Sequence, residues 1–285
     1  MNVKDFFKKA KDYIYASNLC KKYKKIALKI KKAIDDNCET LQHKQSNTIF
    51  VCWFQGLESA PDIVKICYKS LQKYHQDKDI VIITEDNYSQ YVSFPQFIID
   101  RYNDGSIKKT HFSDLLRLEL LIKYGGCWVD STAYFTARIP DYILNSNLFL
   151  FQSFREHDGR TSSISNWFIN SCSNNKMLLL ERDLLYYYWK NNNKLRNYFI
   201  FHKFFEKIVI ELYSDEWKKV LISDNSSPKI LDCYLFDKFN QEWYDIIADK
   251  SFIHKFMYKY PKEKFDMEGT LYDKLKQEYL EAING

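Results

Sequence analysis

The stretch THFSDLLRLELLIKYGGCWVDST, residues 110–132, decides the fold of this chain. Leucines and an isoleucine recur at helical spacing over residues 115–122, which predicts a helix with one face in the core. Gly125 and Gly126 follow the last of them, as expected where a helix ends in a turn with positive φ. The apolar run at 127–129 then predicts a short buried strand.

Three charged residues accompany this helix–turn–strand pattern. Asp114 and Arg117 are three apart and project from one side of the helix, while Asp130 stands at the end of the strand. In open α/β sheets, ligands bind outside the carboxyl ends of the strands. We therefore expect the three side chains to share one pocket. A surface ion pair beside an ordinary turn is the alternative interpretation.

The flanking chain predicts an α/β fold built on a Rossmann-like sheet flanked by helices. A strand over Thr48–Phe54, a helix over Pro61–Tyr74 and a strand over Asp79–Thr84 form a β-α-β unit. Later patterns predict helices over Ser93–Tyr102, Asn175–Trp189, Tyr198–Leu212, Asp215–Leu221, Asp237–Ala248 and Gly269–Ala282. They also predict a strand over Leu148–Phe151 and a strand or turn over Ile164–Ile169, with a polar loop over 155–163 between them. A short apolar segment is expected over Ser251–Tyr258. The second half is thus expected to be rich in helices.

Composition narrows the class of protein. The 285 residues are 46% hydrophobic, enough for a folded core, and contain only 7 Gly and 5 Pro. The 7 cysteines are odd in number and widely spaced, which disfavours a disulfide framework and a zinc knuckle. The chain opens on a charged segment and has no run of eighteen apolar residues, so we expect a cytoplasmic protein without a membrane span.

The first 44 residues are strongly basic. They hold twelve lysines against five acids, a local charge of +7 in a chain whose total is +5. Apolar residues from Ile14 to Ile34 form a loose helical stripe, so we expect one or two amphipathic helices in a segment over 1–45, ahead of a catalytic domain over 46–285. The lysines either face water or attract an anionic membrane surface. No groove-reading motif accompanies them, and we expect no nucleic-acid partner.

The ordered motifs resemble glycosyltransferases of the capsular polysaccharide synthesis family, which are related to the wider group with a D-x-D motif and a GT-A fold. The resemblance covers roughly residues 46–260. It rests on S-D-x-x-R at 113–117, Tyr124-Gly125-Gly126 and Asp130-Ser131-Thr132, and on the pieces Trp53-Phe54-Gln55-Gly56, Ser165-Asn166-Trp167-Phe168-Ile169, Tyr198-Phe199-Ile200-Phe201-His202 and His254-Lys255.

The resemblance implies a UDP-sugar donor and names the residues that would hold it. Trp53 lies where the wider group stacks the uracil ring, with Gln55 beside it; a core tryptophan is the alternative. Asp114 and Arg117 would read the hydroxyls of the donor sugar, since a carboxylate accepts and a guanidinium donates in a fixed fork. A buried ion pair is their competing role. Asn166 would be a polar contact near the sugar or the acceptor.

The same resemblance implies Mn²⁺ or Mg²⁺ on the diphosphate, held by the D-x-D carboxylates. Here the second carboxylate is replaced by Thr132, so Asp130, Ser131 and Thr132 predict a weakened metal site. His254 is the expected third metal ligand, with a satisfied core histidine as the alternative, and Lys255 would neutralise a phosphate directly.

The expected reaction moves galactose or glucose from UDP-galactose or UDP-glucose to a growing, lipid-linked capsular or surface saccharide, with retention of configuration. Asp130, Asp114 and Arg117 are the predicted catalytic residues. His202 matches the family pattern without a defined role, either contacting the acceptor or packing within its helix. A peripheral contact of residues 1–44 with the inner face of the plasma membrane fits such an acceptor. A catalytically weakened sugar-nucleotide-binding or assembly protein is the rival hypothesis, suggested by Thr132.

Overall fold

The computed structural model describes residues 3–38, 42–153 and 164–284, with side chains in α1 from residue 18 onward. Its centre is a mixed five-stranded sheet of order β2-β1-β3-β6-β5, and a two-stranded sheet pairs β4 with β7. The strands are β1 (Thr48–Cys52), β2 (Asp79–Ile83), β3 (Gly126–Asp130), β4 (Ala133–Phe135), β5 (Leu148–Gln152), β6 (Ile164–Ser171) and β7 (Ile253–Lys255). The predicted α/β fold class, a Rossmann-like sheet flanked by helices, is confirmed.

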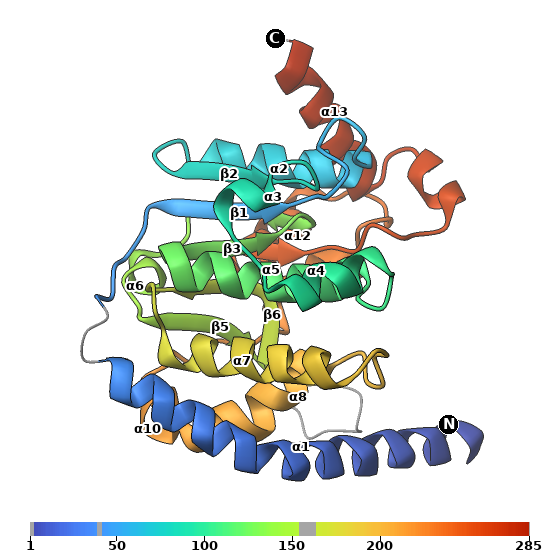
Figure 1. Cartoon of the computed structure of the whole chain (residues 1–285). Helices are drawn as coiled ribbons and strands as arrows, with labels where there is room; N and C mark the ends of the chain where they lie inside the picture. The colour runs from blue at the N-terminus through green and yellow to red at the C-terminus, as the bar shows by residue number, and fades with distance from the viewer. Residues whose placement is uncertain (1–2, 39–41, 154–163, 285) are drawn as a thin grey trace.

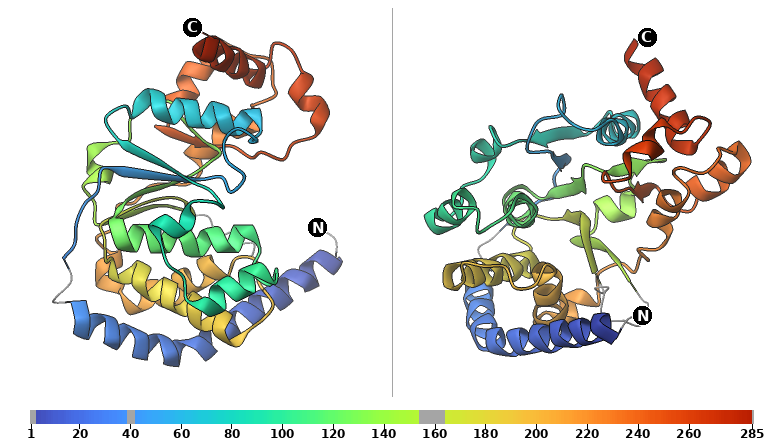
Figure 2. Two further views of the ribbon diagram at one scale, coloured as in Figure 1. Left: turned by 45° about the horizontal axis from the view of Figure 1, so that its top comes forward. Right: turned by 90° about the vertical axis from the view of Figure 1, so that its right-hand side faces the viewer.

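Helices cover both faces of the sheet (Figures 1 and 2). The α-helices are α1 (Val3–Cys38), α2 (Asp62–Tyr74), α3 (Tyr88–Tyr91), α4 (Gln96–Asn103), α5 (Lys109–Tyr124), α6 (Asp141–Leu144), α7 (Lys176–Asn191), α8 (Ile200–Phe204), α9 (Ile210–Leu212), α10 (Ser214–Trp217), α11 (Ile230–Cys233), α12 (Gln241–Ala248) and α13 (Leu271–Asn284). A π-helix, η1 (Phe205–Val209), joins α8 to α9, and two short 3-10 helices are η2 (Ser227–Lys229) and η3 (Lys262–Asp266).

Strand direction separates the two halves of the sheet. β1 pairs in parallel with both β2 and β3, as the β-α-β pattern predicts. β6 runs antiparallel to β3 and to β5. The carboxyl ends of β1 and β3 and the beginning of β6 therefore lie at the same edge of the sheet, which we call the carboxyl edge.

The two faces of the sheet bury different cores. Phe50, Trp128 and Leu150 point to one face and pack with α4, α5 and α7. Val51 and Val129 point to the other and pack with the end of α2 and the segment that leads into α6. Alternation of side chains along each strand supplies both cores at once, which is why these strands read as continuous apolar runs in the sequence.

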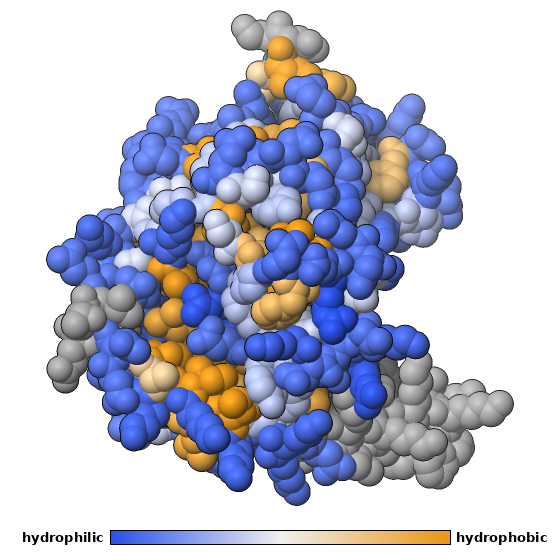
Figure 3. All heavy atoms as spheres, in the orientation of Figure 1, coloured by the Kyte–Doolittle hydropathy of each residue, from blue (hydrophilic) through white to orange (hydrophobic). Residues whose placement is uncertain are grey.

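The basic N-terminal segment is one long helix rather than two. The second half of α1 packs outside α7 and α8, with Tyr23 buried against Tyr188 and Phe204 at ring-centroid distances of 6.2 and 5.0 Å. The N-terminal turns of α1 extend past the end of α7 (Figure 1). Figure 3 shows apolar side chains gathered where α1 meets α7, on a face that is otherwise largely polar.

Several boundaries differ from the sequence prediction. β1 ends at Cys52 rather than residue 54, α12 begins at Gln241 rather than 237, and η1 interrupts the helix expected over 198–212. The three-residue strand β4 was not predicted, because its pairing with β7 joins segments more than a hundred residues apart. The loop expected over 155–163 lies outside the described residues. No described helix is long and apolar enough to cross a membrane.

The Gly125-Gly126 turn sets the path from α5 into β3. Gly125 has φ 71° and Gly126 has φ 93°, values that side-chain-bearing residues rarely adopt. A Cβ at Gly126 would lie 2.3 Å from the Thr48 carbonyl oxygen, and one at Gly125 would lie 2.7 Å from the Lys44 carbonyl oxygen. The turn thus holds the strand against the chain that enters β1.

We expect Gly126→Ala to lower the free energy of unfolding by about 3 kcal/mol, from a left-handed alanine combined with the backbone clash. Gly56→Ala is the matched control, because Gly56 also has positive φ, 78°, but a Cβ added there would meet nothing within 4 Å. That variant should lose only about 1 kcal/mol. Urea denaturation measures both, and equal losses would contradict the tight approach at Gly126.

Candidate active site

The carboxyl edge brings together polar residues from four elements. β3 ends at Asp130, whose register partner in β1 is Cys52. β6 begins there with residues 164–166, and α5 begins there because it runs back along the sheet before the Gly-Gly turn. β7 approaches from the second sheet through its pairing with β4. Arg117 lies within 4 Å of both Asp114 and Asp130 at this edge, whereas the expectation that the three side chains share one ligand pocket stays a prediction.

Arg117 is the most connected side chain at this edge, with 5% of its side chain exposed. Its Nη2 lies 3.3 Å from Asp114 Oδ1, and its Nε donates to the Ser113 carbonyl oxygen at 3.2 Å. Its Nη1 donates to the Asn166 carbonyl oxygen and lies 3.6 Å from Asp130 Oδ1. The guanidinium therefore joins α5 to the ends of β3 and β6.

Asp114 is largely buried and is paired within the protein. Besides Arg117, its Oδ1 accepts from Asn166 Nδ2 at 2.9 Å, and its Oδ2 lies 3.4 Å from His111 Nδ1. Its side chain is 11% exposed. Of the two roles expected for Asp114 and Arg117, the structure displays the buried ion pair, which leaves little of Asp114 for a sugar hydroxyl.

Asp130 is the carboxylate of this group that faces solvent, with 29% of its side chain exposed. Its Oδ1 accepts from the Trp128 indole Nε1 at 3.0 Å. The Arg117 guanidinium lies over the Trp128 ring, with its Cζ 4.8 Å from the ring centroid. Trp128 thus fixes both the cation and the carboxylate, while Asp130 Oδ2 lies on the side of Lys255.

Lys255 occupies the position opposite Asp130. Its Nζ donates to Thr132 Oγ1 and, at 3.1 Å, to the Phe256 carbonyl oxygen, and it lies 3.7 Å from Asp130 Oδ2. Ser131 is half-buried in the turn between the two motif residues. The D-x-T motif is therefore arranged around an ammonium group.

The structure does not bring His254 to Asp130. Neighbouring side chains of a strand point to opposite sides, and Lys255 already faces Asp130. His254 is fully buried, and its Nε2 lies 3.3 Å from Thr136 Oγ1. Burial lowers the pKa of His254 to about 4, opposed by the nearby carbonyl groups of Ala248 and Ser251. It is thus placed as a neutral core histidine.

Trp53 follows β1 at the carboxyl edge. Its ring meets Tyr258 edge-on at 5.4 Å between centroids, and Tyr258 is 40% exposed. The indole Nε1 of Trp53 is buried without a hydrogen-bond partner among the described residues. The indole of Trp53 and the exposed ring of Tyr258 together offer an aromatic border at this edge. Gln55, two residues further on, is exposed.

Sequence reasoning did not single out His111, Tyr198 or Tyr258 as site residues. The Tyr198 ring lies edge-on to His111 at 5.2 Å, and Tyr198 is 60% exposed. Partial burial, followed by the negative charges of Asp114 and Asp130, raises the pKa of Tyr198. The position of His111 three residues before Asp114 was an available signal, and Tyr198 opens the segment 198–202 that resembles the family pattern, whereas no sequence signal places Tyr258 beside this edge.

Two buried ionisable groups lie behind the exposed carboxylate. His202 is largely buried and packs edge-on against the rings of Phe199 and Phe201. Burial lowers its pKa to about 4, with Asp114 opposing that shift. Glu181 of α7 is fully buried with neither oxygen hydrogen-bonded to a described residue, and burial followed by the charge of Asp114 raises its pKa. His202 therefore sits behind the site rather than at its open side.

The donor set here fits a tightly held divalent cation poorly. One carboxylate and one neutral hydroxyl stand where Mn²⁺ or Mg²⁺ would need several hard oxygen ligands, and Lys255 Nζ lies between them. Among residues 3–38, 42–153 and 164–284, no three His, Cys, Asp or Glu side chains group as metal ligands. Cationic side chains provide the positive charge near Asp130.

A buried cation thus lies beneath an open carboxylate at the carboxyl edge of the sheet, where open α/β sheets bind their ligands. A family model described as capsular polysaccharide synthesis protein matches residues 1–275, and the chain belongs to that family. It is also similar to a solved structure titled "PaToxG Glycosyltransferase", with a TM-score of 0.38 and 16% identity over 94% of this chain and 98% of that one. No curated protein matches the chain.

We expect Arg117→Ala to lower the free energy of unfolding by about 3–5 kcal/mol, because it leaves Asp114 buried without its cation. Adding Asp114→Asn to that variant should restore part of the loss, which urea denaturation measures. The matched control is Arg138→Ala, since Arg138 pairs with Asp77 at 2.8 Å on the surface. That variant should lose less than about 1 kcal/mol. Equal losses in both single variants would contradict the buried role of Arg117.

Buried neutral histidines make stability fall as the pH drops. A histidine whose folded-state pKa is about 4 stays neutral while the unfolded chain takes up a proton below its ordinary pKa of 6.5, so stability is present above pH 6.5 and is lost toward pH 4. Between about pH 7.5 and about pH 5.5 the free energy of unfolding of the wild type should fall. In His202→Phe we expect that fall to be smaller by about 1.4 kcal/mol, because one buried neutral histidine is gone. Exposed His43→Phe is the control, and an unchanged pH profile in His202→Phe would refute the prediction.

Proposed function

We propose that the chain transfers galactose or glucose from a UDP-sugar to a growing saccharide unit of a capsular or surface polysaccharide. The observation that carries this proposal is the cluster of Asp130, Thr132 and Lys255 above buried Arg117, at the sheet edge where α/β proteins bind nucleotides. Membership of the capsular polysaccharide synthesis family supports it independently.

The proposed donor site uses the two sides of the carboxyl edge differently. The uracil ring lies against the indole of Trp53, with Tyr258 bordering the indole edge-on. Gln55, Asn166 and Ser131 border the ribose and the sugar. With the base at Trp53, the ribose extends along the carboxyl edge. The diphosphate then lies beside Lys255, whose ammonium group attracts it.

Departure of UDP needs positive charge on the leaving diphosphate. Lys255 supplies it directly once its contact with Thr132 is exchanged for a phosphate oxygen, and Arg117 adds charge from beneath Asp130. Asp130 keeps Lys255 in place, and its partly exposed carboxylate accepts from a sugar or ribose hydroxyl. A divalent ion carried in by the diphosphate would add charge at the same oxygens, and no step here depends on it.

The proposed reaction retains the configuration of the sugar, and its mechanism follows from how few carboxylates near Asp130 are unpaired. A double displacement needs a second free carboxylate against the sugar, and Asp114 is engaged by Arg117 and Asn166. We therefore propose front-side attack: the acceptor hydroxyl oxygen bonds the anomeric carbon as the bond to the UDP oxygen breaks, and the hydroxyl proton passes to the departing phosphate. One glycosidic bond to the acceptor oxygen forms and one glycosyl–phosphate bond breaks, and no side chain acts as a base.

A lipid-linked acceptor at the inner face of the plasma membrane fits the outer side of α1. Lys21, Lys22, Lys25, Lys29 and Lys32 are exposed, while Tyr23 and Ala27 face the protein. A row of exposed lysines on one helix attracts anionic lipid headgroups, at about 1 kcal/mol for each lysine close to the surface. Peripheral contact through α1 would bring the carboxyl edge toward its acceptor.

A sugar-nucleotide-binding protein with weakened catalysis is the second candidate. Thr132 in place of a carboxylate and the internal engagement of Asp114 favour it, because both reduce the polar groups available to the donor sugar. The two candidates share UDP binding and differ in transfer. UDP binding without transfer from UDP-galactose or UDP-glucose to the lipid-linked saccharides of the source membranes would favour the second.

We expect UDP to bind the full chain with and without Mn²⁺ in isothermal titration calorimetry. Lys255→Ala should weaken that binding by about ten-fold or more, the usual value of a charge-assisted contact to phosphate. Asp130→Asn should also weaken it, because Lys255 and Trp128 lose their shared partner. Exposed Lys262→Ala is the matched control. No UDP binding under either condition would reject the donor site.

A further inference from the structure

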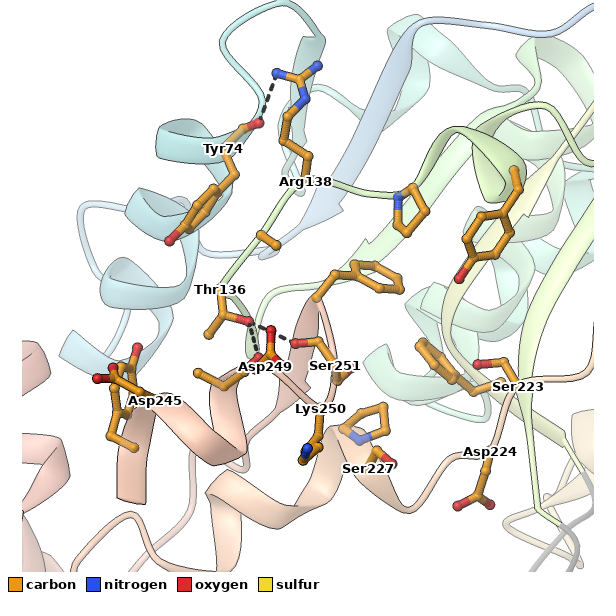
Figure 4. Close-up of a pocket in the computed structure, with 18 residues that line it drawn as sticks. Tyr74, Thr136, Arg138, Ser223, Asp224, Ser227, Asp245, Asp249, Lys250 and Ser251 are labelled. Atoms are coloured by element: carbon orange, nitrogen blue, oxygen red, sulfur yellow. Dashed lines mark hydrogen bonds between the residues drawn. The ribbon is translucent and has the colours of Figure 1, made fainter. Parts of the chain in front are cut away.

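A separate cavity of about 660 Å³ lies on the face of the sheet opposite α5 and α7. Its walls come from the end of α2, the segment after β4, the loop after α10 and the end of α12 (Figure 4). The volume is within the range of about 300–1,000 Å³ found for small-molecule sites. Neither Asp130 nor Lys255 lines it.

The cavity combines aromatic surface with acceptor groups. Tyr142, 64% exposed, and Tyr74 offer rings at its border, and Phe252 forms part of its floor. Phe252 is held by Phe151 at 6.1 Å between ring centroids and by Phe168 at 5.7 Å, so the apolar floor is rigid. Aromatic rings with neighbouring polar groups are the surfaces on which the apolar faces of sugar rings pack.

The charges around the cavity favour a ligand that donates hydrogen bonds. Asp224, Asp245 and Asp249 line it, and Figure 4 shows Asp224 and Asp245 on opposite sides. No described Lys or Arg forms an ion pair with any of these three. Arg138 also lines the cavity, but both oxygens of Asp77 accept from its Nη2 at 2.8 Å, which neutralises it.

Among the lining residues that the structure describes, Lys250 is thus the remaining cation, against three carboxylates. The excess of negative charge disfavours phosphates and uronic acids by like-charge repulsion. Asp245 Oδ1 already accepts from Gln241 Nε2 at 2.8 Å, and Asp224 Oδ2 accepts from the Ser226 amide at 3.0 Å. The other oxygen of each carboxylate is left to accept from the hydroxyls of a hexose. The lining therefore selects a neutral polyhydroxylated ligand with an apolar face.

We propose that this cavity is a second site for a neutral oligosaccharide, which holds part of the glycan away from the site of transfer. That the polyol is a glycan rests on the proposed function, whereas the existence of the site does not. Thr136 lines the cavity and contacts His254, whose neighbour Lys255 contacts Asp130. The cavity and the donor site therefore lie on two sides of β7.

Binding to the full chain is measured by calorimetry and saturation-transfer NMR with three probes: maltohexaose, galactotetraose and hexagalacturonate. We expect at least one neutral probe to bind at about 10 mM or below and the acidic probe to fail. Tyr142→Ala and Asp245→Asn should each weaken neutral binding by about five-fold to ten-fold. Exposed Asp36→Asn on α1 is the matched control for the loss of a carboxylate.

The two sites are distinguished by crossing the variants with the ligands. Tyr142→Ala should keep the affinity for UDP, and Asp130→Asn should keep the affinity for the neutral oligosaccharide. Failure of both neutral probes to bind at about 10 mM would overturn the proposal, whatever the result with UDP. It would equally be overturned by oligosaccharide binding that Asp130→Asn abolishes and Tyr142→Ala leaves unchanged, because the ligand would then lie at the carboxyl edge.

Discussion

The buried guanidinium of Arg117 is the interaction on which the carboxyl edge depends. A cation with 5% of its side chain exposed is tolerated only when its donors are satisfied, and here they reach Asp114, Ser113 and Asn166. Those partners belong to α5 and to the first residues of β6. A single side chain thus fixes how the helix, β3 and the antiparallel strand meet, and it holds positive charge directly beneath the carboxylate that solvent can reach.

The charge balance around Asp130 and Thr132 differs from that expected for a motif with two carboxylates. Where two carboxylates would leave net negative charge to be balanced by a metal, one carboxylate with Arg117 below and Lys255 opposite is already balanced by protein cations. Under the proposed function, a diphosphate replaces Thr132 as the partner of Lys255 and needs no further cation. The threonine at position 132 and the lysine at position 255 are therefore consistent with one another: with a single carboxylate, protein cations suffice to balance the charge.

Local patterns made much of the fold predictable. The helical period over 115–122, the Gly-Gly pair and the apolar runs of β1 and β3 each carry their own structural signal, and the β-α-β order fixes three parallel strands. The antiparallel direction of β6 and the existence of β4 were not predictable, because they depend on pairings between distant segments. For the site, spacing brought Asp114, Arg117 and Asp130 together. It does not reveal that Asp114 is engaged internally, because the partner Asn166 comes from another strand.

His254 and Lys255 show why one residue of strand register matters for function. The two are adjacent in β7, yet Lys255 faces Asp130 while His254 is buried against Thr136 on the way to the cavity. A motif match alone assigns both to the donor site, whereas the alternation of a strand assigns one to each side. Because β7 spans three residues and pairs with the equally short β4, the position of Lys255 depends on the packing of His254 behind it. Lys255 beside Asp130 and its buried neighbour His254 are therefore one structural unit, in which the packing of the histidine sets the position of the lysine.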